Sequence, residues 1–92
     1  MVHYIVHGKA DTVGVAVVDL KKGQSLTGWN MISDSTQRLR ATQAVPLGHK
    51  IALTGIEKGE DVVKYDESIG CAKRAVKKGQ HVHTHNLKTA RW

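Results

Sequence analysis

The sequence predicts a single, mostly β domain with a compact, barrel-like arrangement of short strands and at most one short helix. The chain has 92 residues, which is the size of one small domain. Valine is its commonest aliphatic residue, and the branched Cβ of valine favours extended backbone. Short apolar runs separated by glycine turns are typical of small all-β folds. A chain of this length lines one wall of a ligand pocket more easily than it encloses one, which favours a partner.

One turn pattern recurs along the chain: a glycine, two further residues, and then an aliphatic residue that opens a strand-like run. Three copies share a longer form, which reads Leu20-Lys-Lys-Gly-Gln, Ile56-Glu-Lys-Gly-Glu and Val76-Lys-Lys-Gly-Gln. A fourth copy is shorter and begins at Gly48. Glycine tolerates the positive φ that a tight turn needs, and the spacing is too irregular for a solenoid. The pattern therefore predicts repeated turns in a folded-over β structure.

The strands follow from alternation and from these turns. The segment Thr12–Asp19 is apolar on both faces, which predicts a central strand. Residues 25–44 are polar and carry no clear assignment. The segment Cys71–Lys78 is the candidate for the one short helix, because Ile69, Ala72 and Val76 fall near helical spacing. The expected strands are Val2–His7, Thr12–Asp19, His49–Leu53, Val62–Tyr65 and His81–His85.

Composition argues against a membrane or secreted protein. No run approaches the ~20 apolar residues that a membrane helix needs, and Met1–Ile5 lacks the charged start and apolar run of a secretory signal. Cys71 is the single cysteine, so no internal disulfide can form, which fits a reducing compartment. We therefore expect a soluble, cytoplasmic protein.

The net charge of +6 is concentrated at the C-terminal end. In residues 1–70 the basic and acidic side chains cancel. Residues 71–92 contain no acidic residue. A one-sided charge indicates an anionic ligand or partner, although a solvated basic face would give the same pattern. The basic residues of this segment are Lys73, Arg74, Lys77, Lys78, Lys88 and Arg91.

The most informative segment is Gly79-Gln-His81-Val-His83-Thr-His85-Asn86. Side chains alternate across a strand, so the three histidines are expected on one face, with Val82 and Thr84 directed into the core. Three imidazoles on one face can bind a transition metal, transfer protons near neutral pH or hydrogen-bond an anion. An exposed edge strand that merely tolerates histidine is the less favoured interpretation. No carboxylate lies close in sequence, so a metal would need further ligands from elsewhere, plausibly from another chain.

Other familiar catalytic motifs are missing from the sequence. It contains no phosphate-binding loop, no Cys-x-x-Cys pair and no defensible Ser-His-Asp arrangement. Outside the histidine run, the candidates are His49, just after the Gly48 turn, and Lys64 with Tyr65 at the end of an expected strand. Taken alone, these residues indicate no more than a surface histidine, a snorkelling lysine and a packed tyrosine. The chain is therefore not expected to be catalytically self-sufficient.

Four segments carry a resemblance to a known family. They are His49-Lys-Ile-Ala-Leu, Ile56-Glu-Lys-Gly-Glu-Asp-Val-Val-Lys-Tyr65, Ile69-Gly70 and Gly79-Gln-His-Val-His-Thr-His-Asn86. In this order they resemble the SAF domain of altronate and galactarate dehydratases. The two ends of the chain, Met1–His7 and Asn86–Trp92, resemble the separate small (alpha) subunits of the (R)-sulfolactate sulfo-lyase family. The chain departs from the family pattern at Asp66, where the family has glycine after Lys-Tyr.

The resemblance implies a β-clip fold, a larger catalytic (beta) subunit as partner, an anionic substrate and iron(II) as cofactor. It also implies a lyase reaction, the β-elimination of sulfite or water from a 2-hydroxy acid. We expect His83 and His85 to be catalytic, and Asn86, His49 and Lys64 to bind substrate. The expected metal ligands are His81 and His83.

Within the lyase class, (R)-sulfolactate and a sugar acid such as altronate both remain open as substrates. Two other classes remain as alternatives. The basic C-terminal quarter permits nucleic-acid binding, but aromatic stacking residues are scarce, so this partner is disfavoured. A carbohydrate- or protein-binding module without chemistry is the other alternative.

Overall fold

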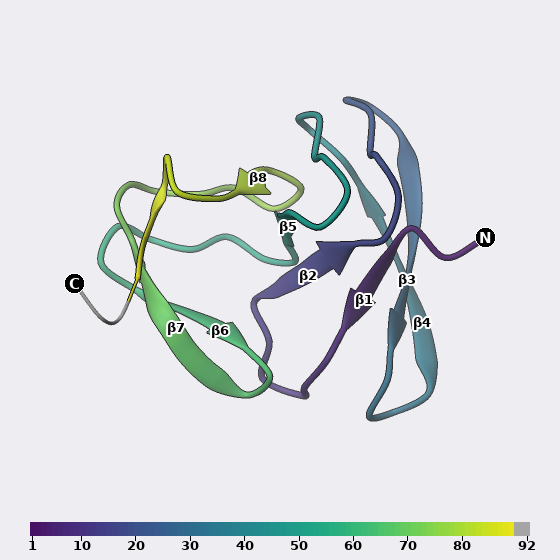
Figure 1. The fold of residues 1–92 in the computed structure, drawn as a ribbon, viewed down its shortest axis with the longest axis horizontal. Coiled ribbons are helices and arrows are strands. Elements are labelled where there is room, and N and C mark those ends of the chain that lie inside the picture. The colour runs from purple at the N-terminus through teal and green to yellow at the C-terminus, as the bar shows by residue number, and fades with distance from the viewer. Residues whose placement is uncertain (90–92) are drawn as a thin grey trace.

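The computed structural model describes residues 1–89, and all regular elements within them are β-strands (Figure 1). The prediction of a mostly β fold is confirmed. The strands form two sheets that lie side by side, without a closed barrel. Within the described range, no helix is present that could span a membrane. Arg91, which belongs to the basic C-terminal segment, lies outside the described residues.

The larger sheet has six strands in the order β4-β3-β1-β2-β5-β8. β1 pairs antiparallel with β2 and parallel with β3, whereas the other neighbours are antiparallel. β2 lies between β1 and β5, which confirms the prediction that this segment is a central strand. The strands are β1 (Tyr4–Val6), β2 (Val13–Ala16), β3 (Ser25–Asn30), β4 (Ser35–Arg40), β5 (Lys50–Ala52) and β8 (His81–Val82).

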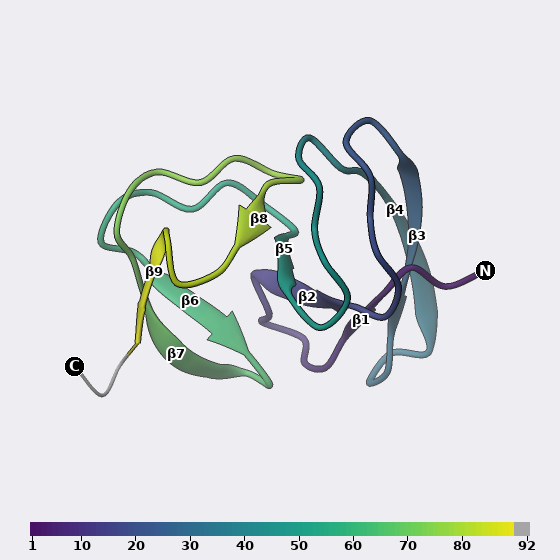
Figure 2. The same ribbon diagram turned by 45° about the horizontal axis from the view of Figure 1, so that its top comes forward.

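The smaller sheet has the order β6-β7-β9 and lies beside strands β2, β5 and β8 of the larger one (Figure 2). Its strands are β6 (Asp61–Lys64), β7 (Glu67–Ala72) and β9 (Leu87–Thr89), all antiparallel. A cluster of buried aliphatic side chains joins this sheet to β2, β5 and β8. That cluster comprises Val13, Ala52, Ile56, Val62, Ala72, Val76, Val82 and Leu87.

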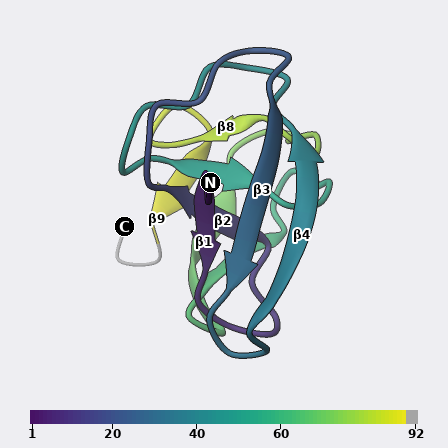
Figure 3. The same cartoon turned by 90° about the vertical axis from the view of Figure 1, so that its right-hand side faces the viewer.

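The two ends of the larger sheet approach each other without pairing as strands. The segment after β4 meets the segment before β8, where Thr42 N donates to Gly79 O at 2.9 Å and His81 N donates to Gln43 Oε1 at 3.0 Å. Figure 3 shows the β3–β4 hairpin standing in front of the remaining strands. The sheet therefore curls around its own core, which gives the barrel-like shape that the sequence predicts.

The repeated glycine turns are one structural unit used four times. Gly23, Gly48, Gly59 and Gly79 have φ between 84 and 87°, a left-handed conformation that favours glycine. In the first turn, Gln24 N donates to Lys21 O, and the Gln24 side chain accepts the Lys21 N–H at 2.9 Å. The turns closed by Glu60 and Gln80 repeat both bonds, whereas the turn at Gly48 keeps only the backbone bond, from His49 N to Pro46 O.

Two local predictions are wrong. Cys71–Lys78 is not a helix: β7 continues to Ala72, and Val76 opens the third long copy of the glycine turn. Its apolar spacing mimics a helix because Ala72 and Val76 are buried from a strand and from a turn, respectively. The strand expected over His81–His85 ends at Val82, and Thr84 is exposed rather than in the core. The unassigned residues 25–44 contain the β3–β4 hairpin.

Candidate functional site

Three histidine rings from two distant parts of the sequence meet at the β5–β8 edge. His49 immediately precedes β5, and His81 begins β8 opposite Ile51 of β5. Because these strands pair, the two histidines are neighbours, with His49 Nδ1 and His81 Nε2 2.8 Å apart. The ring of His83 stacks on that of His49, with centroids 3.9 Å apart. One ring nitrogen from each of these three histidines lies within 4.8 Å of the others.

A turn, rather than strand alternation, directs the later histidines toward this cluster. After Val82 the chain turns, and both Asn86 N and Leu87 N donate to His83 O. The ring of His85 is exposed and its centroid lies 5.0 Å from that of His81. The structure therefore brings His81, His83 and His85 to one side of the molecule, together with His49, which the sequence ranked as a weaker candidate.

Asn86 fixes the turn that carries these histidines. It is the one buried polar residue of the described chain, with 5% of its surface exposed. Its Oδ1 accepts the His83 N–H at 2.9 Å, and its Nδ2 donates to His81 O at 2.8 Å. Both ends of the amide therefore hold the backbone of histidine residues, and a direct contact between Asn86 and substrate stays a prediction.

Pro46 explains why His49 is free to join the cluster. In the other three glycine turns, the residue at the position of His49 uses its side chain to accept the N–H of the first turn residue. Proline has no N–H, so the fourth turn has nothing for such a side chain to accept. The His49 ring instead contacts His81 and His83. The proline beside the glycine turn was the sequence signal that could have raised the rank of His49.

The environment of the cluster favours the neutral form of two of its rings, His81 and His83. Burial, followed by the charges of His85, His49, His83 and Lys50, lowers the pKa of His81 to about 4. Burial, followed by His49, Lys50 and His85, also lowers the pKa of His83. Neutral imidazole is the form that accepts a proton or binds a metal. His81 and His83 are therefore suited to either task at neutral pH.

Acidification is expected to destabilise the isolated, metal-free chain between about pH 6.5 and 4. His81 titrates at its ordinary value of 6.5 when unfolded but near 4 when folded, so the unfolded state binds more protons in this range. As the pH decreases through this range, the free energy of unfolding should decrease by roughly 1–2 kcal/mol. This value is smaller than the full effect of the pKa shift, because the ring is partly exposed to solvent. Urea unfolding with chelator at several pH values measures this. A His81→Gln variant with the same pH dependence as wild type would contradict it.

The donor set of His49, His81 and His83 fits a transition metal. Bonds of about 2.0–2.1 Å at tetrahedral or octahedral angles place ligand nitrogens about 2.8–3.4 Å apart. The His49–His81 separation of 2.8 Å lies at the lower end of this range, so small ring rotations bring the nitrogens into position. Imidazole suits iron, zinc, copper and nickel, and three protein ligands leave positions for a partner chain or substrate. These three residues can therefore bind a metal ion.

Of Lys50 and Lys64, it is Lys50 that lies beside the histidine cluster. Lys50 follows His49 directly and is half-buried, because it lies in β5 opposite Val15 and Val82. Its positive charge contributes to the lowered pKa of His81 and of His83. Lys64 ends β6, with its Nζ 5.4 Å from the centroid of the Tyr65 ring. Sequence reasoning selected Lys64 and missed Lys50, whose burial depends on strand pairing.

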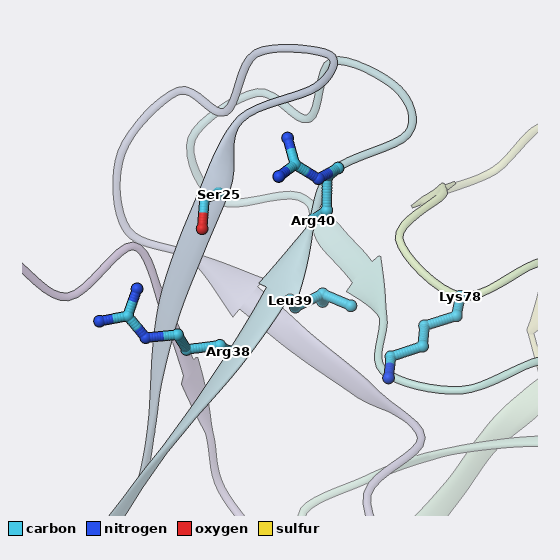
Figure 4. A pocket seen from close by; sticks show the side chains of 5 residues that line it. All are labelled: Ser25, Arg38, Leu39, Arg40 and Lys78. Carbon is cyan, nitrogen blue, oxygen red and sulfur yellow. The ribbon is translucent and has the colours of Figure 1, made fainter.

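A separate basic pocket lies at the C-terminal end of β4 (Figure 4). It has a volume of about 410 Å³ and contains none of the predicted site residues. Its lining residues are Ser25, Arg38, Leu39, Arg40 and Lys78. The histidine cluster, rather than this pocket, combines the side chains with acid–base and ligand chemistry.

Comparison with known proteins identifies the family. The altronate/galactarate dehydratase SAF domain matches residues 2–90. The chain is 42% identical to the (2R)-sulfolactate sulfo-lyase subunit alpha of Chromohalobacter salexigens, over 99% of this chain and 98% of that protein. It is 48% identical to the protein of the same name from Paracoccus pantotrophus, over 64% of this chain and 88% of that one.

A longer relative contains the same domain as one part of its chain. The altronate dehydratase of Escherichia coli is 42% identical over 94% of this chain, but the match covers 16% of that enzyme. The domain thus occurs both as a short separate chain and within a much longer one. By its sequence and its all-β structure, the chain belongs to the altronate/galactarate dehydratase SAF-domain family.

Proposed function

We propose that the chain is the small subunit of a two-chain lyase that performs β-elimination on a 2-hydroxy acid. The most favoured substrate is (R)-sulfolactate, which would give pyruvate and sulfite. The observation that carries this proposal is the cluster of His49, His81 and His83, with His85 beside it. A relative named as a sulfo-lyase subunit matches over nearly its whole length, which supports the choice of substrate.

The reaction needs a base for the C2 proton and an acid for proton return. We assign these roles to His83 and His85, with His83 acting either as the base or as a metal ligand, because a neutral imidazole has one free lone pair. His83 is suited to accept a proton, because burial and neighbouring charges keep its ring neutral. His85 is exposed at the rim of the cluster, where its ring can reach a substrate held between two chains. Loss of the C2 proton and departure of sulfite from C3 leave an enol, which becomes the ketone of pyruvate.

Iron(II) is the proposed cofactor, held by His81 and His83 with His49 as a third ligand. A bound divalent ion would stabilise the negative charge that develops on the substrate carboxylate and 2-hydroxyl oxygen. Its remaining ligands would come from a larger catalytic (beta) subunit, because the cluster supplies imidazole nitrogens alone. Asn86, His49 and Lys64 are the proposed substrate-binding residues. Placement in the cytoplasm stays a prediction from the sequence.

The second candidate reaction is dehydration of a sugar acid of the altronate or galactarate type. It is supported by the match to altronate dehydratase over 94% of this chain. Both reactions remove a proton next to a carboxylate, so the same histidine cluster serves either. A nucleic-acid- or carbohydrate-binding module without chemistry is the alternative of another class.

Reconstitution tests the proposal directly. We expect the chain, combined anaerobically with a larger catalytic (beta) subunit and with iron(II), to release sulfite and pyruvate from (R)-sulfolactate. Neither subunit alone should turn over the substrate. Water loss from altronate without sulfite release would replace the first reaction with the second. A monomer that binds no metal and no larger chain would favour the non-catalytic module.

A further inference from the structure

The two edges of the larger sheet differ in how far they are closed. At β8, Gln43 Oε1 accepts the His81 N–H at 3.0 Å, and Asn86 Nδ2 donates to His81 O at 2.8 Å, so side-chain amides occupy the backbone groups of this short edge. β4, at the opposite edge, has six residues and pairs with β3 over its whole length without a register shift. It contains neither a proline nor a bulge, two features that often block further pairing. β4 is therefore the edge that can accept another strand.

The hydrogen bonds of β3 show which backbone groups of β4 face outward. Thr27 N donates to His3 Nδ1 at 2.9 Å, and Thr27 O accepts the His3 N–H at 2.8 Å, so both groups face away from β4. Arg38 is the antiparallel partner of Thr27, and such a pair leaves the N–H and C=O of both residues pointing away from the opposite strand. The alternation of an antiparallel ladder places those of Thr36 on the same side. Thr36 and Arg38 thus each present a donor and an acceptor to a partner strand.

A glycine turn ends this open stretch of β4. Gly79 lies so close to Arg40 O that an added Cβ would overlap this oxygen, and Thr42 N donates to Gly79 O at 2.9 Å. The backbone beyond Arg38 is therefore covered by the turn that carries Lys78. A partner strand that runs beside residues 36–38 would meet this lysine where it ends.

The basic pocket lies at the same place. Three consecutive residues of β4 line it, Arg38, Leu39 and Arg40, together with Ser25 of β3 and with Lys78 (Figure 4). Neighbouring side chains of a strand face opposite sides, so a space that three of them share lies along the edge or the end of the strand. Its volume of about 410 Å³ accommodates a side chain of a partner. Its lining contains arginine and lysine but no acidic residue.

The charges of the pocket favour an acidic occupant. Arg40 Nη1 donates to Gly23 O at 2.7 Å, and its guanidinium has further N–H groups to donate. Asp34, the acidic residue of this hairpin, lies at the far end from the pocket and accepts the Trp29 Nε1–H at 3.0 Å. β4 itself contains two arginines and no acidic residue, so a second copy of β4 would bring like charges together. A strand with carboxylate side chains would instead pair with them.

We propose that the β4 edge is the docking site for an extended, acidic segment of the larger subunit. The segment adds as a strand beside residues 36–38 and places a carboxylate in the basic pocket. In this mode of recognition, backbone hydrogen bonds supply affinity and side chains supply specificity. The larger subunit as the source of the segment rests on the proposed function. The edge and its preference for acidic residues rest on the pairing of β3 with β4 and on the pocket lining.

Association with the larger subunit, measured by calorimetry, tests the proposal. Thr36→Pro removes an outward N–H and no bond to β3, so it should weaken association about 10-fold, whereas Thr36→Val keeps the N–H and should bind as wild type. Arg38→Glu and Lys78→Glu should each weaken association at least about 10-fold, and less at high salt. Lys58→Glu is the matched control, because Lys58 precedes the glycine of another turn as Lys78 does. Affinities within twofold of wild type for Thr36→Pro and Arg38→Glu would overturn the proposal.

Hydrogen exchange of the isolated chain separates this inference from the proposed function. The probe is a short acetylated peptide of alternating threonine and glutamate. The Thr36 and Arg38 amides should exchange rapidly in the free chain and slowly with the peptide, whereas those of Gln37 and Leu39, which face β3, should be slow in both. The corresponding peptide with lysine in place of glutamate should give no protection.

Each outcome of this experiment has a distinct meaning. Protection by the acidic peptide, without lyase activity in the reconstituted pair, would retain the docking edge and refute the lyase. Peptide binding without protection of Thr36 and Arg38 would refute the edge, whatever the activity. Protection that appears without peptide as the protein concentration rises would assign the edge to a second copy of the chain and overturn the proposal.

Discussion

Replacing His83 or His85 with alanine in the reconstituted enzyme is expected to lower turnover by about 10²–10⁴-fold, the usual contribution of a general acid or base. His83 lies within the cluster, stacked on His49, whereas His85 lies at its exposed rim. Neither ring supports the hydrophobic core, so both variants should keep the fold. Turnover at saturating substrate, with circular dichroism of each small chain, measures the effect.

The two variants should differ in metal content. His83 contributes to the three-nitrogen group and His85 does not, so His83→Ala should lose bound metal and His85→Ala should retain it. Thr84→Ala is the matched control, because Thr84 is exposed between them. Wild-type rates in both histidine variants would show that the catalytic assignment is wrong. Equal metal loss in both would place His85 among the ligands.

Gly70→Ala is expected to destabilise the fold by about 3 kcal/mol, the upper part of the range for overpacking. Gly70 has φ 151°, and a Cβ there would overlap the carbonyl oxygen of Lys88 and approach Thr89 Cα to 2.9 Å. These contacts lie within the β7–β9 pairing, so β9 would have to move away. A loss of this size is a large part of the stability of so small a domain.

Urea denaturation of the isolated chain measures this effect, as a lower midpoint at an unchanged slope. Gly55→Ala serves as the control, because its added Cβ would meet only Val76 O, at an ordinary distance of 3.8 Å. That variant should unfold within about 0.5 kcal/mol of wild type. Equal midpoints for Gly70→Ala and wild type would mean that β9 does not pack against β7 in solution.

Local chemistry made most of the strands predictable. Valine-rich alternation predicted β1 and β2. The glycine after Lys-Lys or Glu-Lys predicted the turns, because glycine tolerates the positive φ that they require. The prediction of a helix near Val76 was wrong because two kinds of local signal conflicted, and the turn motif prevailed over apolar spacing. The β3–β4 hairpin escaped prediction because five of the six residues of β4 are exposed and polar, as an edge strand allows.

The site was predictable in its residue types and less so in its geometry. Alternation indicated that His81 and His83 share a side, and they do come together, but through the turn held by Asn86. His49 joins them through the pairing of β5 with β8, which no local pattern encodes. Lys50 was missed for the same reason, since its burial arises from contacts more than 30 residues apart in sequence.

The glycine turn that occurs four times also has a consequence for which substitutions this fold can accept. In three of the four turns a glutamine or glutamate side chain accepts the N–H of the first turn residue, and in the fourth that residue is Pro46, which has no N–H to offer. The side chain of His49 is therefore not needed for a hydrogen bond within its turn. A substitution at position 49 can therefore change the reactive group while the backbone of the turn stays as it is. The geometry of this turn and the chemistry of the side chain at position 49 are therefore specified by different residues.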